Sequence, residues 1–148
     1  MDSPKCMDGA PADARQMSHW RTRLRVAGAG PAHERRVLRL WANALPQRSG
    51  KRVPETFLPH GLLAQLPGIE AGLAAIARLQ SAHPGADGSE RLLVELADGQ
   101  AVESVLLPRD GLCVSTQVGC AVGCVFCMTG RDGLLRQVGS AEIIVQVA

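Results

Sequence analysis

The tightest constraint on the fold of this chain is a group of three cysteines, Cys120, Cys124 and Cys127, spaced C-x3-C-x2-C. Three thiolates so close in sequence bind one metal centre only if the backbone between them wraps around it. Gly119 and Gly123 provide the conformational freedom for such a wrap. We therefore expect a tight loop with metal-binding or thiol chemistry between two regular elements.

The spacing also distinguishes between kinds of metal centre. A structural zinc site takes four ligands, usually as paired C-x2-C units. The fourth candidate here, Cys113, lies upstream in an expected strand. A 4Fe–4S cluster held by three cysteines leaves one iron open for a substrate. The spacing favours this cluster; a zinc-binding module is the alternative, in which metal analysis would find zinc and no iron.

Composition and the N-terminal sequence exclude several classes of protein. The chain has 148 residues, 46% of them hydrophobic, which is the length of one domain and excludes a mainly disordered protein. Its five cysteines, an odd number in a chain that begins without an apolar secretory segment, favour metal or thiol chemistry over a disulfide scaffold. No apolar run approaches the roughly 18 residues of a membrane span, so we expect a cytoplasmic protein without a membrane helix.

Charge is strongly segregated along the chain. Residues 15–52 contain ten basic residues and a single acidic one, Glu34, whereas residues 53–148 contain five basic and ten acidic residues. A segment this basic is typical of a surface that binds a polyanion such as nucleic acid, and equally of a solvated basic face. Charge alone favours neither interpretation.

The sequence of the first half of the chain predicts helices. Apolar residues at helical spacing predict a helix over residues 32–45, ended by Pro46, and two short helices over 61–66 and 69–79. The tetrad between the short helices, Leu66-Pro67-Gly68-Ile69, resembles the turn of helix-hairpin-helix modules, although an ordinary Pro–Gly turn is the favoured interpretation. The first thirty residues are polar and dotted with Gly, Ala and Pro, so we expect them to be loosely ordered.

The second half reads as mainly β. Its expected elements are a loop over 81–89, a hairpin of strands over 91–96 and 101–107, a short strand over 112–118, and a last helix capped by Ser140. We therefore expect an α/β protein in three parts: a tail over residues 1–30, a helical basic accessory domain over 31–83, and a domain over 84–148 that carries the cysteine loop.

The cysteine motif and the residues around it resemble a known family. The cysteine motif, with the aromatic Phe126 before its last cysteine, resembles the signature of radical S-adenosylmethionine enzymes. The wider sequence resembles the RNA adenine carbon-2 methyltransferases, which modify an adenosine of large-subunit ribosomal RNA and, in some members, of transfer RNA. The matching segments lie between residues 91 and 148 and are Val102–Val105, Leu112–Cys120, Thr129-Gly130, Gly133-Leu134 and Glu142–Ile144.

The resemblance implies a role for each matching residue. The cluster ligands would be the three cysteines of the motif, Cys120, Cys124 and Cys127. Phe126 would lie at the cofactor, shielding the cluster or stacking on a ligand. Cys113 matches the cysteine that resolves a protein–RNA adduct and forms a transient disulfide, and Glu103 matches the acid/base carboxylate. In this family S-adenosylmethionine at the open iron yields a radical, which activates a methyl group carried on a protein cysteine for addition to the base.

The resemblance also implies a fold and partners. Residues 84–148 would be the hairpin, cluster loop and first βα unit of a truncated radical-SAM barrel of the partial TIM type. The methyl-carrying cysteine and the glycine-rich S-adenosylmethionine segment have no counterpart in the chain, so we expect an incomplete, inactive fragment of a monomeric enzyme. Its partners would be RNA and an electron donor such as a flavodoxin-type protein.

Two further alternatives follow from the same residues. One is another radical S-adenosylmethionine enzyme with a different substrate. The other is a non-catalytic RNA-binding protein that uses residues 15–52, whose RNA affinity would survive replacement of the three motif cysteines. Arg131 and Arg136 are candidates for contact with RNA phosphate or S-adenosylmethionine, and equally for solvated loop arginines.

Overall fold

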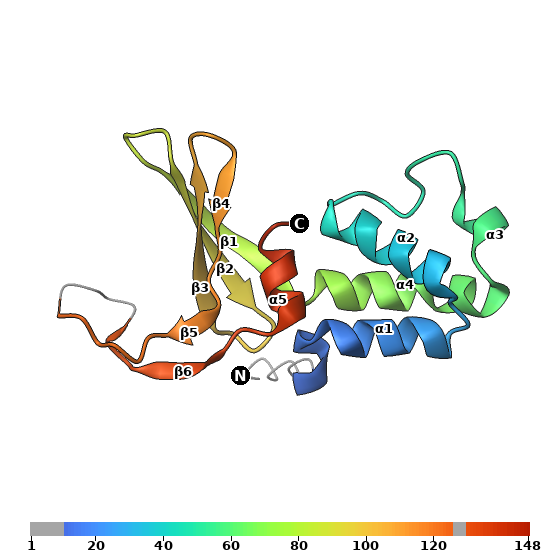
Figure 1. Cartoon of the computed structure of the whole chain (residues 1–148), viewed down its shortest axis with the longest axis horizontal. Helices are drawn as coiled ribbons and strands as arrows, with labels where there is room; N and C mark the ends of the chain where they lie inside the picture. Colours follow the sequence, from blue (N-terminus) through green and yellow to red (C-terminus); the bar gives the residue numbers. More distant parts are fainter. Residues whose placement is uncertain (1–10, 126–129) are drawn as a thin grey trace, which may run out of the picture.

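A computed structural model describes residues 11–125 and 130–148. It is a mixed α/β structure in which a helical half and a β half lie side by side (Figure 1). The helical half comprises a short 3-10 helix η1 (Ala12–Arg15) and the helices α1 (Met17–Val26), α2 (Pro31–Ala42), α3 (Pro54–Phe57) and α4 (His60–Ala74). The β half comprises β1 (Ala77–Pro84), β2 (Glu90–Leu96), β3 (Ala101–Leu107), β4 (Gly111–Cys113), β5 (Gln117–Gly119), β6 (Leu134–Gln137) and the last helix, α5 (Ser140–Val145).

Residues 12–15 and 17–26 are helical, so the expectation of loose order was wrong for these segments. Trp20 and Leu24 of α1 are 2% and 0% exposed and pack into the core of the helical half. The Trp20 indole Nε1 donates a hydrogen bond of 2.8 Å to the carbonyl oxygen of Ala14, which ties η1 to α1. In α1 only Trp20 and Leu24 are buried, and arginines lie between and around them. So few apolar residues do not form a pattern from which a helix could be predicted.

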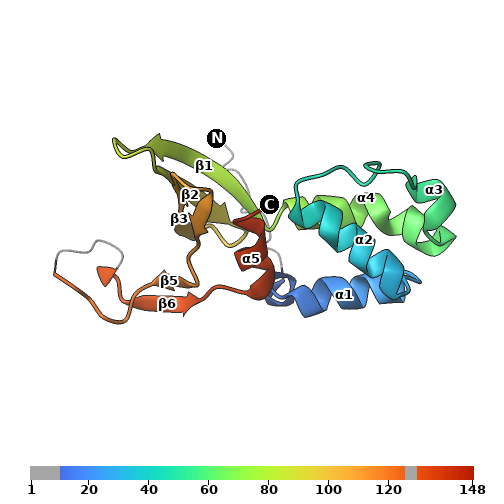
Figure 2. The ribbon, with the colours of Figure 1, turned by 45° about the horizontal axis from the view of Figure 1, so that its top comes forward.

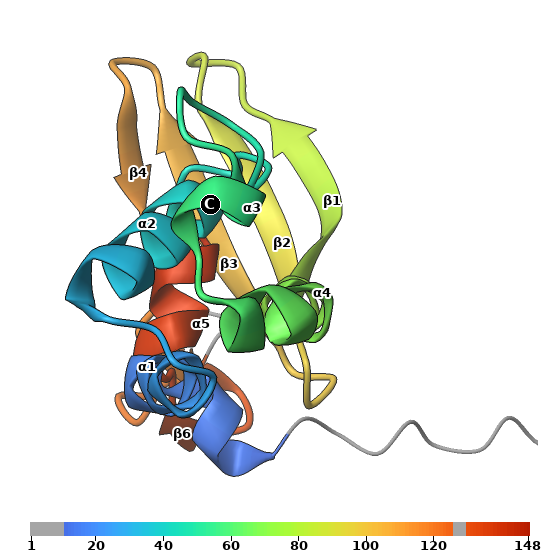
Figure 3. The ribbon, with the colours of Figure 1, turned by 90° about the vertical axis from the view of Figure 1, so that its right-hand side faces the viewer.

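Three long helices enclose this core. Seen from the helical side, α1 and α4 run nearly along the line of sight and α2 crosses beside them (Figure 3). The helix predicted over 32–45 is confirmed as α2, but it ends at Ala42 because the chain turns into the left-handed region at Ala44, where φ is +51°. Val37 and Leu62 are fully buried between the helices, and burial of a side chain of this size stabilises the fold by about 2 kcal/mol.

The two short helices predicted around Pro67-Gly68 are in fact one, since α4 runs unbroken through both residues. Proline inside a helix removes a hydrogen bond and costs about 3 kcal/mol. Packing outweighs this cost, because four apolar residues at helical spacing form a buried face on both sides of the proline: Leu62, Leu66, Ile69 and Leu73. The helix ends at Ala74, and the strand β1 begins at Ala77, inside the segment assigned to the helical domain.

The main sheet is antiparallel throughout and has the order β1-β2-β3-β4. The predicted β2–β3 hairpin is confirmed, with Gly99 at φ +80° and the Leu96 amide donating to the Gln100 carbonyl at 2.8 Å. The loop predicted over 81–89 is wrong in its first part, because β1 continues to Pro84. β1 is an edge strand and is largely exposed, so its sequence lacks an alternating apolar pattern and tolerates proline.

A second sheet, the antiparallel ribbon β5–β6, leads into α5. The core of the β half contains Val94, Leu96 and Val102 of the main sheet together with Val118 of β5 and Val138, and Ile143 of α5 packs against it. Figures 1 and 2 show α5 between the main sheet and the helical half. Within the described residues, no helix combines the length and the apolar character that crossing a membrane requires.

The helix α5 packs into both cores. Ala141, which is 0% exposed, and Val145 belong to the core of the helical half, whereas Ile143 belongs to that of the β half. Ser140 was expected to cap α5, but the capping residue is Gly139, whose amide donates to the Glu142 carboxylate at 2.8 Å. The Ser140 hydroxyl accepts a hydrogen bond from the Met17 amide at 2.9 Å instead, and so joins α5 to α1.

Candidate functional site

The cysteine loop joins β5 to β6 and leaves the end of this ribbon that points away from the helices (Figure 1). Its base is closed by a hydrogen bond of 3.1 Å from the Cys120 amide to the Gly133 carbonyl. Gly119, at φ +76°, allows this closure, because a Cβ atom there would collide with the same carbonyl oxygen. Gly123 within the loop has a φ of +62°. Both glycines therefore allow the chain to turn back sharply, through backbone conformations that other residues rarely adopt.

Two thiols of the motif lie in the described part of the loop. Cys120 is half-buried at the loop base, Cys124 is exposed, and both are free. Cys127 and Phe126 lie outside the described residues. Among residues 11–125 and 130–148, no three side chains of metal-binding type come together. The donor chemistry fits an iron–sulfur cluster, because soft thiolates on a glycine-rich loop are the ligands that such clusters take.

Glu103 and Cys113 share one face of the main sheet. Val105 of β3 is paired with Cys113 of β4, and Glu103 lies two residues before Val105, so all three side chains are on the same side. This face is open: the Glu103 side chain is 50% exposed, and Cys113 is an exposed, free thiol. The only ion pair of Glu103 within the described residues is with Arg91, at 3.6 Å.

The opposite face of β3 is closed against α5. Ser104 is fully buried and donates a hydrogen bond of 2.8 Å to Gln146, which also accepts from the Ser115 amide at 2.9 Å. Glu103 and Cys113 are thus brought together with each other. No hydrogen bond or ion pair in the described parts of the chain joins either of them to the cysteine loop.

A buried ion network lies directly after the cysteine loop. Glu142 of α5 is 1% exposed and accepts two hydrogen bonds, each of 2.8 Å, from the guanidinium of Arg136 on β6. The Arg136 Nε contacts Asp98, in the β2–β3 turn, at 2.9 Å. Arg15 of η1 approaches Asp98 at 3.2 Å and Glu142 at 3.9 Å. The hydrogen bonds to Glu142 are the main cause of a raised pKa of Arg136.

The network changes the interpretation of Arg136. It was considered as a contact to RNA or S-adenosylmethionine, but its side chain is only 18% exposed and is committed to Glu142 and Asp98. Sequence reasoning missed the network, because its members come from four separate elements. The one signal was an acidic residue in the first turn of α5 with an arginine just before it.

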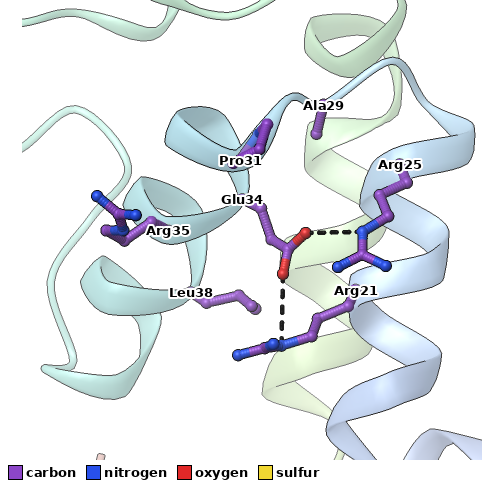
Figure 4. Close-up of a pocket in the computed structure, with 7 residues that line it drawn as sticks. All are labelled: Arg21, Arg25, Ala29, Pro31, Glu34, Arg35 and Leu38. Carbon is purple, nitrogen blue, oxygen red and sulfur yellow. Dashed lines mark hydrogen bonds and ion pairs between the residues drawn. The ribbon is translucent and has the colours of Figure 1, made fainter.

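The helical half carries most of the positive charge. Figure 4 shows a pocket in which two arginines of α1, Arg21 and Arg25, point at Glu34 of α2, with Nε–carboxylate distances of 3.4 and 3.0 Å. Glu34 is 8% exposed and is the single acidic residue of the basic segment. Glu34 therefore offsets one of the three arginine charges that line this pocket, those of Arg21, Arg25 and Arg35, and its carboxylate would repel an anion bound there.

Comparison with known proteins adds a direct finding. No family model matches the chain. A protein of Leptothrix cholodnii named "probable RNA methyltransferase" is 68% identical over 127 residues, covering 86% of this chain and 37% of that protein. A second protein with the same description, from Aromatoleum aromaticum, is 67% identical over 132 residues, covering 89% of this chain and 37% of its own length.

A third protein of this name, from Dechloromonas aromatica, is 64% identical over 129 residues, covering 86% of this chain and 36% of its own length. The chain therefore spans little more than a third of the length of the curated relatives it matches. Identity this high over most of the chain means common ancestry with proteins named as RNA methyltransferases.

Proposed function

We propose that this chain is the cysteine-loop part of an RNA methyltransferase that uses S-adenosylmethionine and a radical mechanism. The substrate would be an adenine carbon of ribosomal RNA, with transfer RNA as the second candidate. One observation carries the proposal: a C-x3-C-x2-C loop with a closed base lies in a sequence 68% identical to a protein named as a probable RNA methyltransferase. The requirement for a radical follows from chemistry, since an amidine carbon of adenine is not nucleophilic.

The three cysteines of the motif would hold the cofactor. Cys120, Cys124 and Cys127 would bind a 4Fe–4S cluster with one iron open for S-adenosylmethionine. When bound, this pair supplies the radical chemistry. The chain itself contributes the closed base of the loop, where Gly119 and the Cys120–Gly133 hydrogen bond hold the half-buried Cys120 in place while Cys124 stays exposed.

Glu103 and Cys113 would act on the RNA adduct. Both side chains emerge from the same open face of the main sheet, where a base could approach them. Cys113 would attack the sulfur of the methyl-carrying cysteine, which has no counterpart in this chain. A transient disulfide would form as the carbon–sulfur bond of the adduct breaks and its electron pair passes to the RNA carbon, and Glu103 would move a proton at the adenine. Arg91 lies 3.6 Å from the Glu103 carboxylate and offers it a positive charge.

The same proposal extends to the architecture and partners. Residues 84–148 would form the beginning of a radical-SAM barrel, and the helical half would contact RNA. The enzyme would be a cytoplasmic monomer reduced by a flavodoxin-type donor.

Anaerobic reconstitution with iron and sulfide tests the cluster. We expect about four iron and four sulfide per chain, with an absorbance and EPR spectrum altered by S-adenosylmethionine. Cys124→Ala should lose most of the iron, whereas Cys113→Ala should retain it because Cys113 lies on the sheet. Bound zinc without iron, or equal iron in the two variants, would contradict the proposed cofactor.

A further inference from the structure

The helical half carries a second hollow that differs from the pocket of Figure 4. It measures about 480 Å³ and lies between α2, the segment that follows α2, and Phe57 of α3. Five cationic residues line it, and no acidic residue does: Arg35, Arg36, Arg39, Lys51 and Arg52. We call this hollow the basic groove.

The charge of the basic groove is not neutralised from within the described chain. Glu34, the single acidic residue of the basic segment, is engaged by Arg21 and Arg25 in the other pocket (Figure 4). Glu55 pairs with Arg48, which does not line the groove. None of the five groove cations forms an ion pair with another described residue. The groove thus concentrates positive charge in a concave surface, which attracts an anion.

Part of the groove wall is fixed in place. Arg36 donates a hydrogen bond of 2.7 Å to the Gln47 carbonyl, and its guanidinium lies 5.7 Å from the centre of the Phe57 ring. The Arg52 guanidinium lies 5.1 Å from the same ring. Gln47 is 5% exposed and donates to the Val37 carbonyl at 3.0 Å, which anchors the segment after α2 to that helix. Cations held this way lose less entropy when they bind a ligand.

We infer that the basic groove binds phosphate groups of an RNA backbone, with Arg39, Lys51 and Arg52 as the exposed contacts. The inference rests on the proposed function for its choice of RNA. Guanidinium groups match phosphate oxygens in pairs, and a groove suits a chain that passes through it. Such contacts fix the position of the RNA without reading its sequence.

An anionic membrane fits this surface less well. Peripheral helices bind membranes by inserting an apolar face. The large apolar residues of α1 and α2, such as Trp20, Leu24 and Val37, are buried in the protein core instead. The basic groove is lined by three large apolar residues, Leu40, Leu45 and Phe57, but these do not form the continuous apolar helix face that membrane insertion uses.

The test measures RNA affinity of the full chain across a salt series. The probe is a fluorescein-labelled, mixed-sequence single-stranded RNA of about 16 nucleotides, followed by fluorescence anisotropy. The groove variant is R39Q/K51Q/R52Q. Each lost phosphate contact on a single strand lowers the slope of log K against log salt by about 0.7, so the slope should fall by about 2. Affinity at low salt should fall at least about tenfold.

A second triple variant, R48Q/R78Q/R109Q, is the matched control. It removes the same formal charge from exposed residues that do not line the groove. It should keep the wild-type affinity to within about twofold. Equal losses in the two triple variants would show that net charge alone attracts RNA and would overturn the inference, as would a groove variant that binds RNA normally while its circular dichroism is native.

Two further measurements do not depend on the groove variant. RNA should slow the acylation of Lys51 by an amine-reactive ester in the wild-type chain, and an unchanged rate would overturn the inference. Phosphatidylserine vesicles that bind the wild type more tightly than RNA would assign the groove to a membrane. If Cys124→Ala and the wild type both fail to load iron but bind RNA through the groove, the proposed iron–sulfur cofactor and its radical mechanism fail while the groove stands.

Discussion

At the scale of single residues, Glu142 places a negative charge where water does not reach it. Both carboxylate oxygens accept hydrogen bonds of 2.8 Å from Arg136, and one also accepts from the Gly139 amide. A buried charge is tolerated only when its partners are present. The pKa of Arg136 is raised above its usual high value, chiefly by the hydrogen bonds to Glu142. Stability that depends on a raised pKa is lost only as pH rises through that pKa, so Arg136 stays charged throughout the neutral range.

Glu142→Gln should therefore lower the free energy of unfolding by about 3 kcal/mol, because it leaves the guanidinium of Arg136 without its buried counter-charge. Urea unfolding followed by circular dichroism measures the change. Glu70→Gln removes the same charge from an exposed position of α4 and should change stability by less than about 0.5 kcal/mol. Similar effects of the two substitutions would mean that the ion network does not stabilise the fold.

At the scale of elements, α4 shows how packing overrides a local signal. The helix continues through Pro67 and Gly68 because its buried face on either side is held against α1 and α2. At Gly72, α4 packs tightly against Trp20 of α1: a Cβ atom there would lie 2.6 Å from Cη2 of Trp20. A Cβ atom at Gly68 would meet nothing within 4 Å.

Substitutions of Gly68 and Gly72 in α4 should have opposite effects on stability. Gly68→Ala should stabilise the protein by up to about 1 kcal/mol, since alanine is the better helix former. Gly72→Ala should destabilise it by about 1–3 kcal/mol, because the Trp20 ring has to move. Thermal unfolding midpoints measure both. Stabilisation by both substitutions would show that α1 and α4 do not pack this closely.

The elements that sequence predicted correctly are those whose signal is local. The β2–β3 hairpin has a turn with its own glycine, and α2 has a continuous apolar stripe. The helix α1, the unbroken α4 and the edge strand β1 depend on partners distant in sequence, so local patterns missed them. In the candidate site, the cysteine motif was readable from its spacing, whereas the shared face of Glu103 and Cys113 and the Arg136–Glu142 network required the tertiary structure.

At the scale of the whole molecule, the two halves are joined through α5. Ala141 packs in the helical core and Ile143 in the β core, and the ion pair of Arg15 with Asp98 adds a polar connection at 3.2 Å. Both tryptophans, Trp20 and Trp41, belong to the helical half, so tryptophan fluorescence reports on that half alone.

Ile143→Ala should consequently shift the fluorescence-detected unfolding midpoint as well as the one detected by circular dichroism. The loss should be about 2 kcal/mol by either probe, because α5 transmits it to the helical half. Leu79→Ala, at a β1 position that is 60% exposed, should shift neither midpoint. A change in circular dichroism without a change in fluorescence would mean that the halves unfold independently.

The division of α5 between two cores also bears on how this part of the chain can change in length. Successive residues of an α-helix are rotated by about 100°, so one extra residue at the start of α5 would turn every later side chain away from its partner. Ala141 would leave the helical core, Ile143 the β core and Glu142 its guanidinium partner in a single event. The helix α5 can therefore accept substitutions at its exposed positions, but an insertion or deletion in its first turn would disrupt both halves together.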